Sequence, residues 1–147
     1  DDTDIGTLPA HRRQIGVIYQ DALLFPHLTV GENLAFGLAP SILAKARYAA
    51  VQDALAAASL EGFGQRDPAS LSGGQAARIA LMRALLAAPK ALLMDEAFSS
   101  LNPDLRRQFG HFVAEQIKLR QIPALLVSHD AADREFATDP VLQFPQK

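Results

Sequence analysis

The stretch that decides the fold is Ala91-Leu92-Leu93-Met94-Asp95-Glu96, in which four apolar residues are followed by two acids. A run this short, apolar on both faces, is typical of a buried parallel strand. A predicted helix precedes it, from Ser72 to about Ala88, and ends at Pro89 because proline cannot continue a helix. The stretch therefore predicts a helix that leads directly into a buried strand.

A second helix and a second strand follow this stretch. Asn102-Pro103-Asp104 is the pattern of an N-cap, a proline in the first helical position and an acid in the first turn. Pro123 to Val127 is predicted to be a second buried strand, and Asp130 to about Ala137 a last short helix. Residues 141–144 are a candidate for one further strand. The alternation of strands and helices predicts an α/β fold with a parallel sheet.

The chain before residue 72 is predicted to add one strand and a mostly helical insertion. Residues 14–19 are a short β-prone run. Thr29 and Glu32 have the spacing of a capping box, which predicts a helix to about Leu38. Residues 41–60 are predicted to form a further helix with one apolar stripe. That stripe is expected to consist of Leu43, Ala46, Ala50, Ala54 and Ala58.

Composition narrows the class of protein. A length of 147 residues is that of one domain. The 14 basic and 16 acidic residues give a net charge of −2, which offers no electrostatic reason to bind nucleic acid or anionic lipid. The absence of cysteine excludes disulfides and Cys-ligated zinc. No apolar run approaches the ~18 residues of a membrane span, so we expect a soluble, cytosolic domain.

Polar residues follow the predicted strands at Gln20, at Asp95 and Glu96, and at His129. Ligands of parallel α/β sheets bind just past the carboxyl ends of the strands. Paired carboxylates there can hold Mg²⁺ together with nucleotide phosphates, and the second acid can orient or deprotonate a water. A histidine can donate a hydrogen bond to phosphate. The alternatives, an acid cluster at a helix N-terminus and a capping or surface histidine, stay open on these residues alone.

The segment Leu71-Ser72-Gly73-Gly74-Gln75 places two glycines in the first turn of a predicted helix. Ser72 and Gln75 have capping-box spacing. Each glycine costs the helix ~1 kcal/mol relative to alanine, which suggests that something approaches the backbone closely. The amides and the positive helix end would suit phosphate. A plain serine cap after a flexible loop is the open alternative.

The remaining candidate residues are interpreted as structural. Arg12-Arg13 and Arg106-Arg107 are predicted to lie on solvated faces, and Phe109 and Phe112 in the core. The three other histidines are also predicted to be structural; they are His11, His27 and His111.

The combination of motifs, in this order, strongly resembles the ATP-binding subunits of ABC transporters. Residues 18–21 and 24–30 are similar to the family's Q-loop and its continuation, and residues 71–75 match its signature motif. Residues 91–96 resemble the Walker B strand, 98–102 the D-loop and 127–130 the switch-histidine segment. The amino-acid sequence of the Q-loop region most resembles that of importers of inorganic ions, thiamine and related small solutes.

The resemblance implies a role for each matching residue in binding and hydrolysing ATP with Mg²⁺. Asp95 would hold Mg²⁺ through water, and Glu96 would be the general base. Gln20 would contact Mg²⁺ or the attacking water and sense the membrane partner, and His129 would contact the γ-phosphate. Two motifs would face a second ATP-binding subunit. The signature residues Ser72, Gly73, Gly74 and Gln75 would cover the γ-phosphate of its ATP, and the D-loop residues Ser99, Ser100, Leu101 and Asn102 would form the subunit interface.

The resemblance also implies partners and a location. The loops around Gln20 and the helices after it would dock on a transmembrane permease subunit, and a solute-binding protein would take part indirectly. A nucleic acid is not expected. The protein would lie on the cytoplasmic face of the inner (plasma) membrane. The transported solute is not readable here, because its specificity belongs to the partner subunits.

The largest departure from the family pattern is the missing P-loop. A P-loop ends in Gly-Lys-Ser/Thr, and none of the nine glycines is followed by lysine. We therefore expect residues 1–147 to be a single partial domain with a P-loop NTPase-like core, truncated at its N-terminus and inactive alone. About 21–88 would be the Q-loop and helical subdomain with the signature motif, and about 14–20 and 89–147 the α/β core portion.

Smaller departures are Ala97, where the family usually has proline, Asn102, where the D-loop usually has aspartate, and Ala76-Ala77, where basic or Gln residues are common. Two other functions stay open. One is an ATPase of DNA maintenance or translation that shares the signature motif. The other is a non-catalytic dimerisation or regulatory half-domain.

Overall fold

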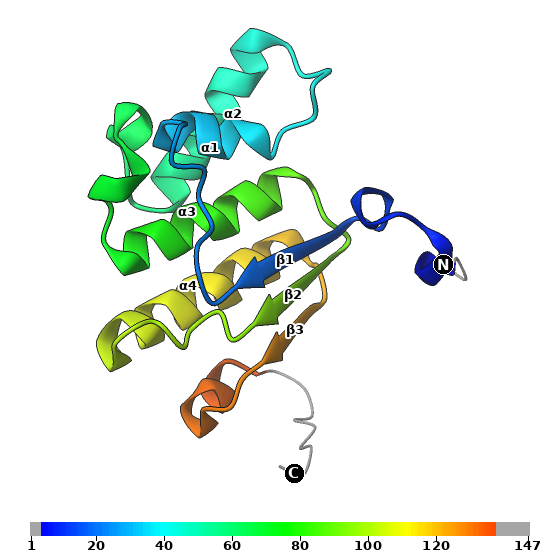
Figure 1. The fold of residues 1–147 in the computed structure, drawn as a ribbon, viewed down its shortest axis with the longest axis vertical. Helices are drawn as coiled ribbons and strands as arrows, with labels where there is room; N and C mark the ends of the chain where they lie inside the picture. Colours follow the sequence, from blue (N-terminus) through cyan, green and yellow to red (C-terminus); the bar gives the residue numbers. More distant parts are fainter. Residues whose placement is uncertain (1–3, 138–147) are drawn as a thin grey trace.

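The computed structural model describes residues 4–137, so the candidate strand at 141–144 lies outside the described residues. Three parallel strands form one sheet in the order β1-β2-β3 (Figure 1). They are β1 (Ile15–Tyr19), β2 (Ala91–Asp95) and β3 (Ala124–Val127). Their register aligns Val17, Leu93 and Leu125 across the sheet. The predicted parallel α/β core is confirmed, with each strand at its expected place.

Two long helices cover one face of this sheet. They are α3 (Gly73–Leu86) and α4 (Pro103–Arg120), and Figure 1 shows both lying along the strands. Ile18, Leu92 and Met94 point into this layer and are buried, as are Phe109 and Phe112 of α4. The expectation that both phenylalanines belong to the core is therefore confirmed. This side of the sheet and its helices form the main hydrophobic core.

A helical part lies above the sheet and packs on α3 (Figure 1). It contains α1 (Val30–Phe36) and α2 (Ala44–Ala57). The predicted capping box at the start of α1 is present: the Thr29 side chain accepts from the Glu32 amide, and the Glu32 carboxylate accepts from the Thr29 amide. Short 3-10 helices complete the described chain at Ile5–Thr7, Ala10–Arg12, Phe63–Gln65, Pro68–Ser70 and Ala131–Phe136.

The predicted apolar stripe of α2 is wrong in its first half. The Leu43 side chain is 79% exposed and Ala46 is exposed as well. The buried face is instead formed by Val51, Ala54, Leu55 and Ala58. These positions are three or four residues apart, as one helix face requires. The larger side chains of Val51 and Leu55 gain more from burial than alanine does, and they set the face.

The prediction that Pro123–Val127 is a buried strand is also wrong. In β3 the side chains of Leu125 and Val127 are 59% and 47% exposed. They share the sheet face that carries the exposed side chains of Ile15, Val17 and Tyr19, because alternate residues of a strand point to the same side. Within residues 4–137 the helices cover only the opposite face, so an apolar strand is left half-exposed.

Candidate functional site

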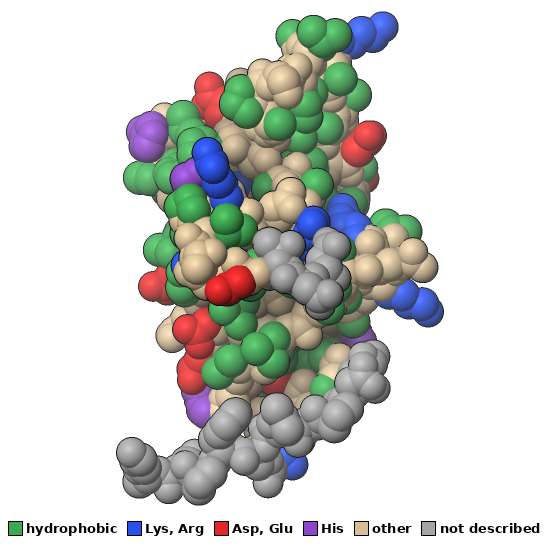
Figure 2. Space-filling view, turned by 90° about the vertical axis from the view of Figure 1, so that its right-hand side faces the viewer, with side chains coloured by type: hydrophobic (Ala, Val, Ile, Leu, Met, Phe, Trp, Pro, Cys, Tyr) green, Lys and Arg blue, Asp and Glu red, His purple; other side chains and the backbone are tan. Residues whose placement is uncertain are grey.

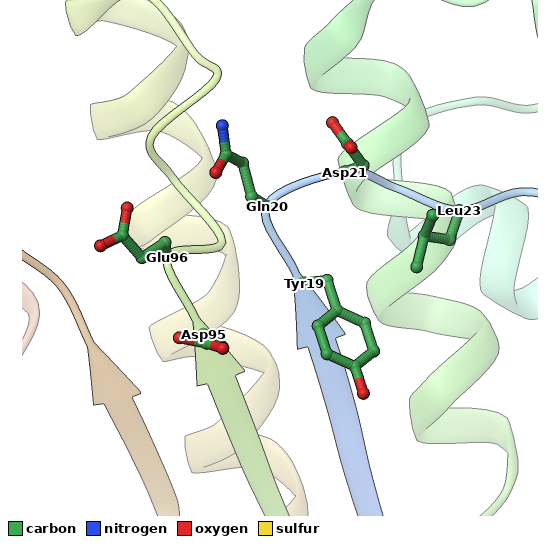
Figure 3. Close-up of a pocket in the computed structure, with 6 residues that line it drawn as sticks. All are labelled: Tyr19, Gln20, Asp21, Leu23, Asp95 and Glu96. Atoms are coloured by element: carbon green, nitrogen blue, oxygen red, sulfur yellow. The ribbon is translucent and has the colours of Figure 1, made fainter.

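The ends of β1 and β2 bring three of the predicted site residues together. Tyr19 pairs with Asp95 in the sheet register, so Gln20 and Glu96 leave their strands at the same level. A pocket of about 280 Å³ lies here. Figure 3 shows that the Gln20 amide projects on the side of Glu96, whereas Tyr19 points away. The pocket is lined by Tyr19, Gln20, Asp21, Leu23, Asp95 and Glu96.

Glu96 has a left-handed backbone conformation, with a φ of 51°. Such a φ is uncommon for a residue with a side chain and costs of the order of 1 kcal/mol. Three hydrogen bonds hold it. The Glu96 amide donates to the Val127 carbonyl at 2.9 Å, and its carbonyl accepts from the Ser99 amide at 3.0 Å and the Ser99 hydroxyl at 2.8 Å. The strand thus ends at Asp95, and the left-handed backbone of Glu96 sets the direction of the Glu96 carboxylate.

His129 contacts the Glu96 side chain. Its Nδ1 lies 2.9 Å from Oε2 of Glu96, and the two residues come from the ends of neighbouring strands. A carboxylate can only accept, so Nδ1 carries a hydrogen, and Nε2 can donate to an anionic ligand when the ring is protonated on both nitrogens. Both side chains are accessible, with 62% of the His129 side chain exposed. The structure therefore brings His129 into the same cluster as Gln20, Asp95 and Glu96.

The pocket is strongly acidic, because Asp21, Asp95 and Glu96 all line it. A polyphosphate would be repelled by these carboxylates unless a cation lay between them. Mg²⁺ prefers oxygen ligands and commonly takes one or two carboxylates, several waters and phosphate oxygens. The carboxylates of Asp95 and Glu96 and the amide oxygen of Gln20 fit that set. Residues 4–137 contain no group of three acidic, histidine or cysteine side chains that could bind a metal unaided.

The signature turn lies apart from this pocket. Ser72 caps α3, and its hydroxyl and the Gln75 side chain complete a reciprocal capping box. A Cβ added to Gly74 would lie 3.3 Å from the Leu105 side chain, whereas one on Gly73 would make an ordinary contact. Close packing on α4 is therefore one reason for the glycine at 74. The turn lines a second pocket of about 230 Å³, with Ser59, Leu60, Arg78, Leu105, Gln108 and Phe109.

The D-loop residues hold the site loops in place. Ser99 bonds to Glu96 as described, and the Ser100 hydroxyl donates to the Gln20 carbonyl at 3.1 Å. Leu101 is buried in this chain. Asn102 caps α4, since its side chain accepts from the Leu105 amide at 3.0 Å. The Ser100 contact links the ends of β1 and β2, which the motif spacing did not reveal.

The expectation that both residues of the Arg106-Arg107 pair are solvated is wrong for the first. Arg107 is exposed, with 63% of its side chain accessible, whereas only 14% of the Arg106 side chain is accessible. Arg106 pairs with Asp130 and Asp133 in the segment after His129. The Asp130 pKa lies below its ordinary value, first because Asp130 accepts a hydrogen bond from the Ala132 amide, and further because Arg106 and His129 are nearby.

Two further residues that sequence reasoning missed hold the loop after Gln20. Arg83 of α3 donates to the Leu23 carbonyl at 3.0 Å. Asn33 is fully buried in α1 and bonds to both the amide and the carbonyl of Phe25. A polar residue inside an otherwise apolar helix face was the only sequence signal, and it indicates burial with partners without identifying them.

Comparison with known proteins identifies the family. The family model described as "ABC transporter" matches residues 1–99. The chain belongs to the ABC transporter family. Curated relatives of this ABC transporter chain include the uncharacterized ABC transporter ATP-binding protein YnjD of Escherichia coli (strain K12), which is 50% identical over 129 residues. The match covers 88% of this chain and 59% of YnjD.

Two relatives carry more specific names. The thiamine import ATP-binding protein ThiQ of Cereibacter sphaeroides is 42% identical over 141 residues, which cover 95% of this chain and 61% of ThiQ. An Fe(3+) ions import ATP-binding protein, FbpC 3 of Rhodococcus jostii, is 44% identical over 126 residues, which cover 85% of this chain and 36% of that protein. The chain thus spans less than two thirds of each of these relatives.

Solved structures agree on the fold. CbiO1 of Clostridium perfringens, described as part of the ABC transporter complex CbiONQ, matches with a TM-score of 0.73 and 28% identity over 81% of this chain and 48% of its own. The ATP-binding cassette MJ0796, a dimer bound to ADP and Pi, matches with a TM-score of 0.71 and 28% identity over 92% and 61%. The fold of the ABC transporter chain is therefore that of part of an ABC ATPase domain. No helix within residues 4–137 has the length and apolar character of a membrane span.

Proposed function

We propose that this chain is the portion of an ATP-hydrolysing subunit that carries the general base, the Mg²⁺ ligand, the switch histidine and the signature motif, and that the whole protein energises import of a small solute or ion. The observation that carries this proposal is the contact between Glu96 and His129 beside an acidic pocket at the carboxyl ends of adjacent strands. The relatives that are named for thiamine and Fe(3+) import support the assignment to import.

Each residue of the pocket has a chemical task in this proposal. The Glu96 carboxylate accepts a proton from the attacking water. Its partner His129, in the form protonated on both ring nitrogens, orients Glu96 through Nδ1 and donates from Nε2 to the γ-phosphate. Asp95 holds Mg²⁺ through water, and the Gln20 amide contacts the same ion or the attacking water. Mg²⁺, when bound, supplies the charge that lets phosphate approach these acids. Catalysis of this kind depends on positioning and electrostatic stabilisation.

The signature turn is proposed to act on ATP that is bound mainly by a second ATP-binding subunit. Gly73 and Gly74 begin α3, where amides without helical partners and the positive helix end favour an anion. The turn lines a pocket of its own, separate from the acidic one, which is compatible with a role toward a different nucleotide. The D-loop segment 99–102 is proposed to face the same second subunit, with Ser100 and Asn102 exposed toward it, whereas Leu101 is buried within this chain.

The division of the chain is proposed to follow its contacts. About 21–88 form the Q-loop and helical subdomain, and about 14–20 and 89–147 the core portion. A P-loop would have to be supplied by a strand, loop and helix that this sequence does not contain. Without that loop, ATP would lack its main phosphate contacts with the protein. Residues 1–147 are therefore proposed to be inactive alone.

The surface around the helical part is proposed to receive a transmembrane permease subunit on the cytoplasmic face of the membrane. Several large apolar side chains are exposed on the loop after Gln20 and on or next to α1 and α2: Leu23, Phe36, Leu43 and Tyr48. Figure 2 shows hydrophobic side chains over this upper, helical end of the molecule. Replacing Phe36 and Tyr48 by serine should abolish co-purification with the permease of the same transport system, whereas Leu119→Ser, which changes an exposed leucine of α4, should not.

The experiment that tests the function uses a P-loop fusion, defined as this chain joined at its N-terminus to a strand–P-loop–helix segment of an ABC transporter ATP-binding subunit. The fusion should hydrolyse ATP with Mg²⁺. Glu96→Gln should lower the rate at least about a hundredfold while ATP still binds and drives dimerisation. The matched control is Glu61→Gln, an exposed glutamate in the loop before α3. An inactive fusion, or wild-type turnover in Glu96→Gln, would overturn the proposal.

A further inference from the structure

His129 is exposed, yet its ring is held at a defined place. Apart from the Glu96 carboxylate, no hydrogen bond to the imidazole is present among the described residues. Ordering an exposed side chain costs conformational entropy, and that cost is smaller when the backbone on either side of it is already fixed. The position of the ring therefore depends on the residues on either side of it, Ser128 and Asp130.

Both of these flanking residues are tied to a single buried ion pair. Arg106 of α4 faces Asp133, and their side chains are 14% and 4% exposed. Its Nε lies 2.9 Å from Oδ1 of Asp133, which pairs the charges although the N–H is not aligned for a hydrogen bond. Nη2 donates to Oδ2 of Asp133 at 3.3 Å.

From this pair one contact reaches each side of the histidine. On the far side, Nη1 of Arg106 donates directly to the Asp130 carboxylate. On the near side, the Ser128 hydroxyl donates to Oδ2 of Asp133 at 2.5 Å and also accepts from the Asp130 amide at 3.0 Å. The segment is thereby closed into a small hydrogen-bonded loop with His129 at its tip.

The same arginine connects this loop to the end of the D-loop. The Arg106 amide donates to the Asn102 carbonyl at 2.8 Å in the first turn of α4. Asn102 is the last residue of the D-loop and follows Ser100 and Leu101 in the chain. A rigid helical turn thus joins the segment that contacts the Gln20 carbonyl to the segment that holds His129.

We propose that Arg106 is a positioning residue that holds His129 against Glu96 by fixing Ser128 and Asp130 on its two sides. The catalytic importance of this arrangement rests on the function proposed above; the positioning itself does not. A planar guanidinium presents several donors in a fixed fork and can bind two carboxylates at once. Lysine has one charged nitrogen and cannot span both in the same geometry.

The test uses isotope-labelled residues 1–147 without nucleotide, so that it is independent of ATP hydrolysis. The variants are Arg106→Lys, which keeps a charge beside buried Asp133, and Arg106→Met, which leaves that carboxylate unpaired. The control is Arg107→Met, because Arg107 is exposed and, within residues 4–137, forms its ion pair with Asp104 alone. The readouts are the imidazole carbon–proton signals of His129 and the amide exchange of Asp130, Ala132 and Asp133.

In both Arg106 variants the His129 imidazole signals should move, and the three amides should exchange at least about tenfold faster, since a charge-assisted hydrogen bond is lost. The amides of Leu92 and Leu93 in β2 should keep their wild-type exchange in Arg106→Lys, which separates release of the loop from unfolding. Wild-type His129 signals in Arg106→Lys, or the same changes in Arg107→Met, would overturn the proposal. Failure of Glu96→Gln to stop hydrolysis would overturn the proposed function and leave this result standing.

Discussion

Nδ1 of His129 lies 2.9 Å from Oε2 of Glu96, although 33 positions separate the two residues in the chain. The sheet makes this contact, because the Glu96 amide bonds to the Val127 carbonyl at the end of β3, two residues before His129. An acid that faces an imidazole at the ends of parallel strands is suited to orient a water beside a phosphate.

The first prediction concerns this contact. In the P-loop fusion, His129→Ala should lower the rate of ATP hydrolysis by about a hundredfold or more, because a donor to the charged transition state is lost. ATP affinity, measured by fluorescence titration, should change far less. His111→Ala is the control, because His111 lies in α4, contacts the Phe136 ring and is outside the pocket. Equal rates in His129→Ala and the unchanged fusion would exclude a catalytic role for this histidine.

The second prediction concerns residues 1–147 by themselves. Incubated with radiolabelled ATP and Mg²⁺, they should release no phosphate above the buffer background. Equilibrium dialysis should find no tight ATP binding, because the P-loop amides and lysine that carry the main phosphate contacts are missing. Turnover by the isolated chain at the rate of the P-loop fusion would contradict the proposal that residues 1–147 are inactive without a P-loop.

The third prediction concerns Asn33, which fixes the loop after Gln20. Its Oδ1 accepts from the Phe25 amide at 2.8 Å, and its Nδ2 donates to the carbonyls of Phe25 and Thr29 at 3.1 and 3.0 Å. Asn33→Leu leaves these buried backbone groups without a hydrogen-bond partner and should lower the free energy of unfolding by about 3 kcal/mol. Urea denaturation followed by circular dichroism measures it. The control is Gln52→Leu, at a half-buried position of α2, whose free energy of unfolding should stay near that of the wild type.

The fourth prediction concerns the close approach of α1 and α3. A Cβ on Gly37 would lie 2.1 Å from the carbonyl oxygen of Arg83, so Gly37→Ala forces the two helices apart. We expect a loss of about 1–3 kcal/mol in the free energy of unfolding. Gly64→Ala is the matched control, because its Cβ would make an ordinary 3.5 Å contact with Leu55. Equal thermal midpoints for the two variants would show that α1 is not held this closely.

The fifth prediction concerns acid. Hydrogen bonds to Glu32 from the Thr29 amide lower the pKa of this carboxyl below its ordinary value of 4.5. A lowered pKa in the folded state contributes stability above pH 4.5, and this contribution is lost as the pH falls through the folded pKa. Glu32→Gln keeps the capping hydrogen bond without the charge. The wild type should therefore exceed Glu32→Gln in urea midpoint at pH 7 and lose that advantage progressively as the pH falls below 4.5. A difference that does not vary with pH would contradict the assignment.

The sequence was most informative where structure depends on neighbouring residues. The capping boxes at Thr29 and Ser72 and the cap at Asn102 were predicted and are present, because each joins groups three positions apart. The three strands were predicted from short apolar runs. Placing Gln20, Asp95 and Glu96 at one edge followed from parallel strands alone, since their carboxyl ends must meet on the same side.

Burial and long-range pairing were beyond the sequence. An apolar run at β3 predicts a strand but cannot show whether a second layer covers it, and among the described residues one face of β3 is exposed. Arg106 was predicted to be solvated because a charged residue on a helix usually is, whereas its partners Asp130 and Asp133 lie 24 and 27 residues away in the chain. Local patterns thus determined the elements and the order of the motifs. Only the packing of α4 against the segment that follows β3 decided what holds the histidine, because that contact joins segments with no fixed spacing.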